Sequence, residues 1–261
     1  MRRTNHNPSA EFAHLFPDRE FRSRGSLGFR HLPYIVRPII EHIHETKPDI
    51  VVAGDRGGRF FAVTAMKSWA HRYPEHHFPT ASGKIHMARV TKRSASGGEV
   101  AEATRWTLQQ AGIDEIRKKA EQDGKAPSVL YMDDWAVYGG TVDRFISAAK
   151  KEGIPKKNIT YATLCGHPVG DSVTHIIGDP DINPRRSEWD SEGGNEAFVG
   201  VNYSRSAPTI PIAAMNPDAV RARQYVDLVV DQYYENFDAA IQSGTIAACS
   251  CVAIQAVPEN V

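Results

Sequence analysis

The sequence predicts an α/β protein whose mostly parallel sheet carries helices on both faces, with a hood or extra lobe built from the chain ends. The first supporting observation is that short apolar runs of strand length alternate with longer segments whose apolar residues recur at helical spacing. Such alternation is typical of a sheet covered by helices on both sides. The second is length, because 261 residues can form one large domain, or a core with an added lobe, without cross-links.

In the first half of the chain, we expect a helix over residues 32–46, where Ile35, Ile39 and Ile43 recur at helical spacing. The next expected elements are a strand over 49–53, a helix over 60–70, a strand over 84–90 and a helix over 100–122. Residues 91–99 are small and polar, which predicts a loop between the last two elements.

In the second half, an apolar run predicts a strand over residues 129–132, and a helical pattern follows over 141–151. Two further apolar runs predict strands over 159–164 and 173–177. Residues 178–200 are rich in turn dipeptides, and loops of this length are usually functional or disordered.

One strong helical pattern lies near the C-terminus. Asn216 is expected to cap this helix, Pro217 fits its first turn and Gly244 can end it. We therefore expect three parts: an N-terminal segment over 1–30 that could belong to the hood, a core over 31–180, and a C-terminal lobe with this long helix over 181–261.

The charge balance and hydropathy exclude some classes of partner. Lysine and arginine number 31, as do aspartate and glutamate, whereas a nucleic-acid binder more often has a net positive charge. The first ten residues are polar, unlike a signal peptide, and the longest apolar run, 246–257, is shorter than the roughly 20 residues of a membrane span. We expect a cytoplasmic protein with neither a nucleic-acid nor a membrane partner.

The most informative segment runs from Tyr131 to Thr141. It places Asp133 and Asp134 at the end of an expected strand, where ligands of open α/β sheets bind. A Gly-Gly-Thr turn then opens a helix, and such a turn points backbone N–H groups at an anion. Because two neighbouring carboxylates can hold sugar hydroxyls or a metal-bound water, the pattern indicates a ribose-phosphate site.

A second glycine-rich turn follows the first expected strand. It reads Gly-Asp-Arg-Gly-Gly-Arg over residues 54–59 and leads into the next expected helix. Glycines there let the backbone approach a diphosphate, and Arg56 could pair with it in a forked geometry.

Together the two turns resemble the motifs of type I phosphoribosyltransferases, over about residues 31–180. In that family an apolar strand, two acidic residues and Gly-Gly-Thr form the ribose-phosphate signature, and Arg-Gly-Gly often follows the first core strand. This chain departs from the signature at Val137 and Tyr138, where the family usually has threonine or another small residue.

The resemblance implies an enzyme that transfers ribose 5-phosphate from phosphoribosyl diphosphate to a nitrogenous base or amine and releases diphosphate. Asp133 and Asp134 would be the catalytic residues, which hold ribose hydroxyls, and would bind the Mg²⁺ cofactor directly or through water. The other implied roles are ribose-phosphate binding by Val137, Tyr138, Gly139, Gly140 and Thr141, diphosphate binding by Asp55, Arg56, Gly57 and Gly58, and closure by a flexible loop carrying Lys92 and Arg93.

The implied partners are phosphoribosyl diphosphate or a nucleotide, together with a small-molecule acceptor. The long C-terminal helix could also support a homodimer. An alternative is a non-catalytic sensor of phosphoribosyl diphosphate or nucleotides on the same fold, which the departure at Val137 and Tyr138 keeps open.

Other motifs in the chain favour ordinary structural roles. Residues 131–134 also spell a reverse-transcriptase tetrapeptide, but that motif sits at a hairpin, and a helix is expected here. A haloacid-dehalogenase nucleophile needs Asp-x-Asp, and Trp135 occupies the third position. The Glu75-His76-His77 cluster lacks the helical spacing of a zinc pair, and Cys249 and Cys251 have no second pair to complete a zinc site.

Overall fold

The computed structural model describes residues 32–55, 58–89, 97–136, 140–166, 174–178, 201–203, 211–213, 224 and 226–236. Within them, the main sheet has five strands in the order β2-β1-β3-β4-β5, and each neighbouring pair is parallel. The strands are β1 (Ile50–Asp55), β2 (Ile85–Arg89), β3 (Val129–Ala136), β4 (Ile159–Gly166) and β5 (Thr174–Ile177). The predicted mostly parallel sheet is confirmed.

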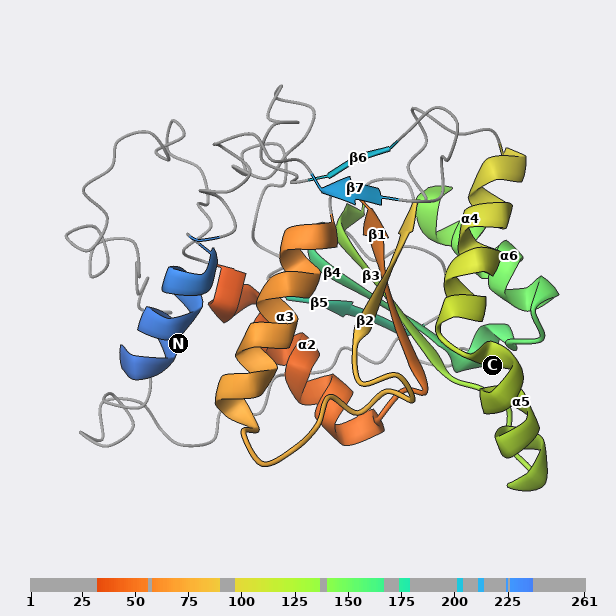
Figure 1. Cartoon of the computed structure of the whole chain (residues 1–261), viewed down its shortest axis with the longest axis horizontal. Helices are drawn as coiled ribbons and strands as arrows, with labels where there is room; N and C mark the ends of the chain where they lie inside the picture. The colour runs from red at the N-terminus through yellow and green to blue at the C-terminus, as the bar shows by residue number, and fades with distance from the viewer. Residues whose placement is uncertain are drawn as a thin grey trace, which may run out of the picture.

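Helices cover both faces of this sheet, as predicted (Figure 1). They are α2 (Leu32–Thr46), α3 (Gly58–Arg72), α4 (Gly97–Gln110), α5 (Ile113–Gln122), α6 (Gly140–Lys151) and a C-terminal helix over 226–236. A short 3₁₀ turn, Lys156–Asn158, precedes β4. None of the described helices is long and apolar enough to cross a bilayer.

One core lies between the sheet and the helices α2, α3 and 226–236, and we call it the α3-side core. Ile39 and Ile43 of α2 and Phe61 of α3 are fully buried there, against Leu130 and Met132 of β3. Apolar residues at helical spacing therefore give α2 its buried face.

The second core lies on the opposite face, and we call it the α6-side core. Val129 and Tyr131 of β3 pack there against Phe145 of α6 and Leu108 of α4. Because successive strand residues point to opposite faces, Val129 and Tyr131 reach one core while Leu130 and Met132 reach the other. Strands buried on both faces explain why the sequence shows continuous apolar runs instead of alternation.

Three predicted boundaries differ from the structure. The helix expected over 100–122 is two helices, α4 and α5, broken at Gly112, whose φ of 82° is left-handed. Strand β1 continues through Asp55, and β3 continues through Asp133 and Asp134 to Ala136. Both predicted strands therefore end too early.

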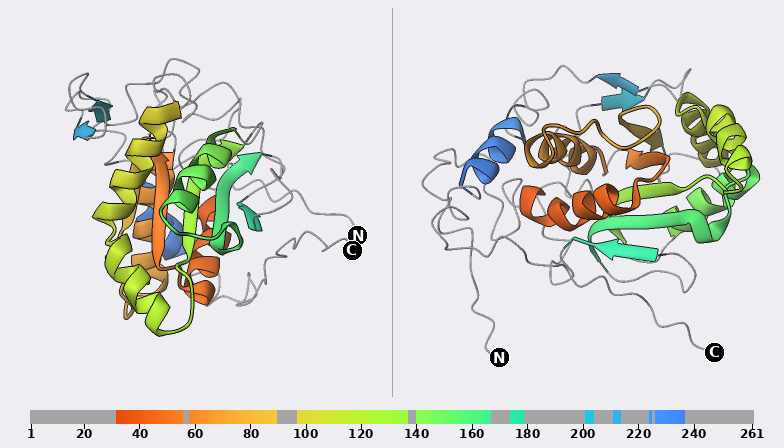
Figure 2. Two further views of the ribbon diagram at one scale, coloured as in Figure 1. Left: turned by 90° about the vertical axis from the view of Figure 1, so that its right-hand side faces the viewer. Right: turned by 90° about the horizontal axis from the view of Figure 1, so that it is seen from below.

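The region expected to form a hood falls mostly outside the described residues, which exclude 1–31 and most of 181–261. Two short strands from it, β6 (Val201–Tyr203) and β7 (Pro211–Ala213), form an antiparallel pair that the sequence analysis did not predict. The pair lies at the end of the molecule toward which the sheet strands point (Figures 1 and 2).

Candidate functional site

The candidate site lies where β1 and β3 end side by side. Ala53 of β1 pairs with Met132 of β3, so that Gly54 and Asp55 come next to Asp133 and Asp134. The sheet order reverses between these strands: β2 lies beyond β1, and β4 lies beyond β3. Their following helices, α3 and α6, belong to opposite faces. Ligands of open α/β sheets bind in the crevice at such a point.

Asp133 is held by two donors of its own strand. The Tyr131 hydroxyl donates to Oδ2 over 3.2 Å, and the backbone N–H of Asp134 donates to Oδ1 over 3.0 Å. Both carboxylate oxygens thus accept a protein hydrogen bond while keeping further lone pairs for a ligand. Asp134 is buried, with 7% exposure, and its side chain interacts with the Asp133 carboxyl.

Burial raises the pKa of the Asp133 carboxyl above its usual value. Desolvation is the largest cause, because it disfavours the charged form. The Asp134 side chain, the Asp134 backbone N–H and the Tyr131 hydroxyl act on this pKa in the opposite direction. A bound cation or a set of sugar hydroxyls would restore the solvation that this carboxylate loses.

Two glycines, one at the end of β1 and one at the start of α3, allow these elements to lie close to β3. A Cβ atom on Gly54 would lie 2.5 Å from the Tyr131 hydroxyl oxygen and 3.1 Å from Asp133 Oδ1. A Cβ atom on Gly58, the first residue of α3, would lie 3.1 Å from the Met132 carbonyl oxygen. The N-terminus of α3 therefore rests directly on the strand that carries the carboxylates.

Asp55 is fully buried and is engaged by Arg59 of α3. Arg59 donates from Nε to Oδ1 over 3.0 Å and from Nη2 to Oδ2, so the contact is bidentate. This pair links the end of β1 to the first turn of α3 across the predicted diphosphate turn. Within the structure, Asp55 thus serves Arg59 and helps to fix the turn.

The second turn opens α6, which begins at Gly140, followed by Thr141. The first N–H groups of a helix lack intrahelical partners and carry partial positive charge, which suits an anion. The other residues predicted to bind phosphate or to close over the site are Arg56, Gly57, Lys92, Arg93, Val137, Tyr138 and Gly139, and they lie outside the described residues.

A polar neighbour group lies beside Asp133 on β4 and β5. Thr163 pairs with Asp133 in the sheet register, and its Oγ1 lies 2.8 Å from Nε2 of His175. His175 also stacks on Tyr161, with ring centroids 4.6 Å apart. Burial lowers the pKa of His175 to about 4, so its imidazole is neutral near pH 7.

Asp133 and Asp134 offer the carboxylate oxygens that Mg²⁺ prefers. Among the described residues, no group of three His, Cys, Asp or Glu side chains could hold an ion. An ion at this edge would therefore complete its shell with water or with ligand oxygens, as Mg²⁺ commonly does. The donor set fits that mode of binding.

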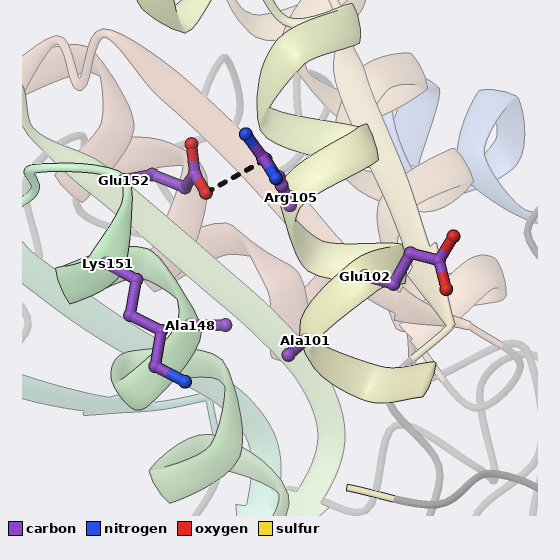
Figure 3. Close-up of a pocket in the computed structure, with 6 residues that line it drawn as sticks. All are labelled: Ala101, Glu102, Arg105, Ala148, Lys151 and Glu152. Atoms are coloured by element: carbon purple, nitrogen blue, oxygen red, sulfur yellow. Dashed lines mark ion pairs between the residues drawn. The ribbon is translucent and has the colours of Figure 1, made fainter. Parts of the chain in front are cut away.

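A separate cavity of about 430 Å³ lies between α4 and α6 (Figure 3). Its lining residues are Ala101, Glu102, Arg105, Ala148, Lys151 and Glu152. Arg105 and Glu152 are paired across it at 3.3 Å, while Lys151 and Glu102 point away from this pair. None of the predicted site residues lines this cavity.

The sequence analysis assigned no role to three residues that shape the site, namely Tyr131, Arg59 and Gly54. Tyr131 and Asp133 are two residues apart on one strand, a spacing that puts both side chains on one face. Asp55 and Arg59 are four residues apart across a helix start, a spacing that favours an ion pair. Gly54 has no local signal, because its role depends on a hydroxyl from the neighbouring strand.

No protein-family model matches this sequence, and a search of curated proteins finds no match. Among solved structures, the chain is similar to a purine phosphoribosyltransferase from Pyrococcus horikoshii Ot3, with 16% sequence identity and a TM-score of 0.30. That match covers 57% of this chain and 88% of the other.

Proposed function

We propose that this protein is a phosphoribosyltransferase that moves ribose 5-phosphate from phosphoribosyl diphosphate to a nitrogenous base or amine. The observation that carries the proposal is that Asp133 lies where β1 and β3 end side by side and the strand order reverses, with α3 beginning against β3 and α6 following β3 in the chain. Helix starts of this kind can bind anions. A sugar with a phosphate on one side and a diphosphate on the other matches that order.

In this proposal, the ribose lies over Asp133, whose carboxylate accepts hydrogen bonds from the ring hydroxyls. As diphosphate leaves C1, positive charge develops on the ribose, and an oriented carboxylate nearby stabilises it. The N–H groups at the start of α6, with the Thr141 hydroxyl, hold the 5-phosphate. Asp134 would assist Asp133 in holding Mg²⁺, which would supply positive charge for the diphosphate.

The diphosphate would lie against the turn before α3. The bidentate pair of Asp55 and Arg59 fixes the ends of that turn, and Arg56 with the glycines 57 and 58 would contact the ligand. The loop with Lys92 and Arg93 would close over the reacting atoms and exclude water. The chain ends, 1–30 and 181–261, would complete the acceptor pocket above the strand ends.

Thermal unfolding with and without ligand tests this proposal. With Mg²⁺ present, phosphoribosyl diphosphate at 100 times its Kd should stabilise the protein by about 2.7 kcal/mol, because it binds only the folded state. For a chain of this size that corresponds to a rise in Tm of roughly 5–10 °C. Release of diphosphate across a panel of purine, pyrimidine and amine acceptors then identifies the reaction.

The double variant Asp133→Asn with Asp134→Asn should lose both the Tm shift and the turnover. Asp114→Asn is the control, since this exposed carboxylate on α5 pairs with Arg117 away from the strand ends. Wild-type protein that shows no shift at millimolar ligand contradicts the proposal. Binding without diphosphate release on any acceptor would instead support the sensor alternative.

A further inference from the structure

We propose that Tyr131 and Gly54 act together as positioning residues that orient the Asp133 carboxylate for the ribose. This inference rests on the proposed function and deepens it. It concerns Gly54 of β1 and Tyr131 of β3, and the family motifs assign no role to either residue. Its three members form one connected unit: Gly54 leaves space, the Tyr131 hydroxyl occupies that space, and the hydroxyl donates to Asp133.

The Tyr131 ring is fixed before any ligand arrives. It is fully buried and stacks on Phe145 of α6, with centroids 4.3 Å apart and planes 19° apart. It also stacks on Tyr161 of β4, at 5.7 Å and 14°. Side chains packed this closely stay in one rotamer, so the hydroxyl has one position.

The hydroxyl settles the orientation of the Asp133 carboxyl group. The Asp134 backbone N–H holds Oδ1, and the Tyr131 hydroxyl holds Oδ2. Without the hydroxyl, Oδ2 would lose this donor, and the last torsion of aspartate is broad, so the group could rotate more freely. With both oxygens held, the remaining lone pairs point in set directions, and preorganised groups of this kind bind and stabilise a ligand more effectively.

Gly54 is required for the space it leaves. Its φ is not among the positive values found at Gly83, Gly112, Gly124 and Gly153, so backbone conformation does not demand glycine there. A Cβ atom would instead approach the Tyr131 hydroxyl oxygen to 2.5 Å, a distance that forces one of them to move. Since the tyrosine ring is packed on both sides, the displaced atom would break the bond to Asp133.

The first test compares ligands with and without a ribose on Tyr131→Phe. Calorimetry with Mg²⁺ would measure the Kd of ribose 5-phosphate and of inorganic diphosphate. We expect ribose 5-phosphate to bind about tenfold more weakly to this variant, and inorganic diphosphate to bind within a factor of two of wild type. A merely structural role would weaken both ligands together or neither. Tyr161→Phe is the control, because it removes a hydroxyl from the neighbouring ring of the same stack.

The second test is a double-mutant cycle with Gly54→Ala. In the wild-type background, Gly54→Ala should lower the Tm. It should also weaken the binding of ribose 5-phosphate about as much as Tyr131→Phe does. In the Tyr131→Phe background the closest clash is gone, although Asp133 Oδ1 remains at 3.1 Å from the added Cβ. The loss of Tm on adding Gly54→Ala should therefore be clearly smaller there, and the ribose 5-phosphate Kd should change little further.

The outcomes separate this inference from the proposed function. Wild-type protein that binds neither ribose 5-phosphate nor diphosphate overturns the proposed function. If wild type binds both, but Tyr131→Phe keeps its ribose 5-phosphate affinity, Tyr131 does not position Asp133. Effects of Tyr131→Phe and Gly54→Ala that simply add, in both Tm and Kd, would show that the two residues do not act as a unit.

Discussion

At the scale of single residues, the Asp133 carboxylate lies where burial disfavours its charged form. Burial is the largest influence on the Asp133 pKa and raises it, although the neighbouring Asp134 and the Tyr131 hydroxyl act against the rise. A structural aspartate in this position would be costly, and aspartate is depleted in strands generally. In the proposed function, a cation or a sugar that solvates the carboxylate would offset that cost.

His175 offers a residue-scale prediction about pH. Burial lowers its pKa from 6.5 to about 4, so the unfolded chain takes up a proton in this range while the folded protein does not. Stability should therefore fall as the pH drops from about 6.5 to 4, by at most about 3 kcal/mol. His175→Gln should flatten this part of the profile, because an amide can bond to Thr163 without titrating. Urea unfolding at several pH values measures the effect.

Thr160→Val is a suitable comparison for that experiment. Thr160 lies on β4 opposite Thr174 and carries no titrating group, so the pH profile should keep the slope of the wild type. A His175→Gln profile parallel to wild type between pH 4 and 6.5 would contradict the prediction.

Some residue roles follow from the sequence and others depend on the fold. Asp133 and Asp134 could be located because adjacent carboxylates before a glycine turn are a local pattern. The bond from Tyr131 is also local, and period-two spacing could have revealed it. The clash distance at Gly54 arises from β1 pairing with β3, and such pairing leaves no mark near Gly54 in the sequence.

At the scale of elements, the predicted end of strand β3 is wrong because contacts with a distant strand determine where it ends. The apolar run predicts a strand over 129–132 that ends before Asp133, and aspartate disfavours strands. The structure continues β3 through Trp135 and Ala136, which pair with Cys165 and Gly166 of β4. Pairing with β4 provides partners for the backbone N–H and C=O groups of these residues, so the strand continues past residues of low strand propensity.

The prediction of one helix over 100–122 is wrong for a local reason, a glycine that can be seen in the sequence. Ala111 and Gly112 separate α4 from α5, and Gly112 adopts a left-handed conformation that ends one helix before the next begins. An isolated glycine inside a helical pattern is often tolerated, so the pattern on both sides favoured one continuous helix.

The C-terminal helix over 226–236 gives an element-scale prediction. Val230 is fully buried in the α3-side core, whereas Leu228 on the same helix is 45% exposed. Val230→Ala should lower the free energy of unfolding by roughly 1–3 kcal/mol, through lost burial and a cavity. Leu228→Ala should change it by less than about 0.5 kcal/mol, as surface substitutions usually do.

Denaturant unfolding of the two variants checks this docking. The helix lies beside α3 (Figure 2). The two are linked by an ion pair of Lys67 with Asp227 and by a hydrogen bond between His71 Nε2 and Asp231 Oδ1 at 2.8 Å. Equal midpoints for Val230→Ala and wild type would mean that the helix contributes little to the stability of the core.

At the scale of the whole molecule, the five-stranded sheet has a core on each face and the candidate site at the ends of two of its strands. The class of fold could be predicted, because strand–helix alternation is a property of the sequence as a whole. The order β2-β1-β3-β4-β5 could not, since it records which distant runs pair. That order places the ends of β1 and β3 side by side, where the candidate site lies.

A shared sheet also predicts that the two cores unfold together. Ile39 of α2 and Ile146 of α6 are buried on opposite faces, and changing either to valine should cost roughly 0.5–1.5 kcal/mol. In a variant that keeps Trp69 as its only tryptophan, fluorescence reports the α3-side core, and far-UV circular dichroism reports the helices of both sides. Ile146→Val should shift both signals to the same lower urea midpoint, and the double variant should show the sum of the single losses. A Trp69 midpoint unmoved by Ile146→Val would show instead that the two faces unfold independently.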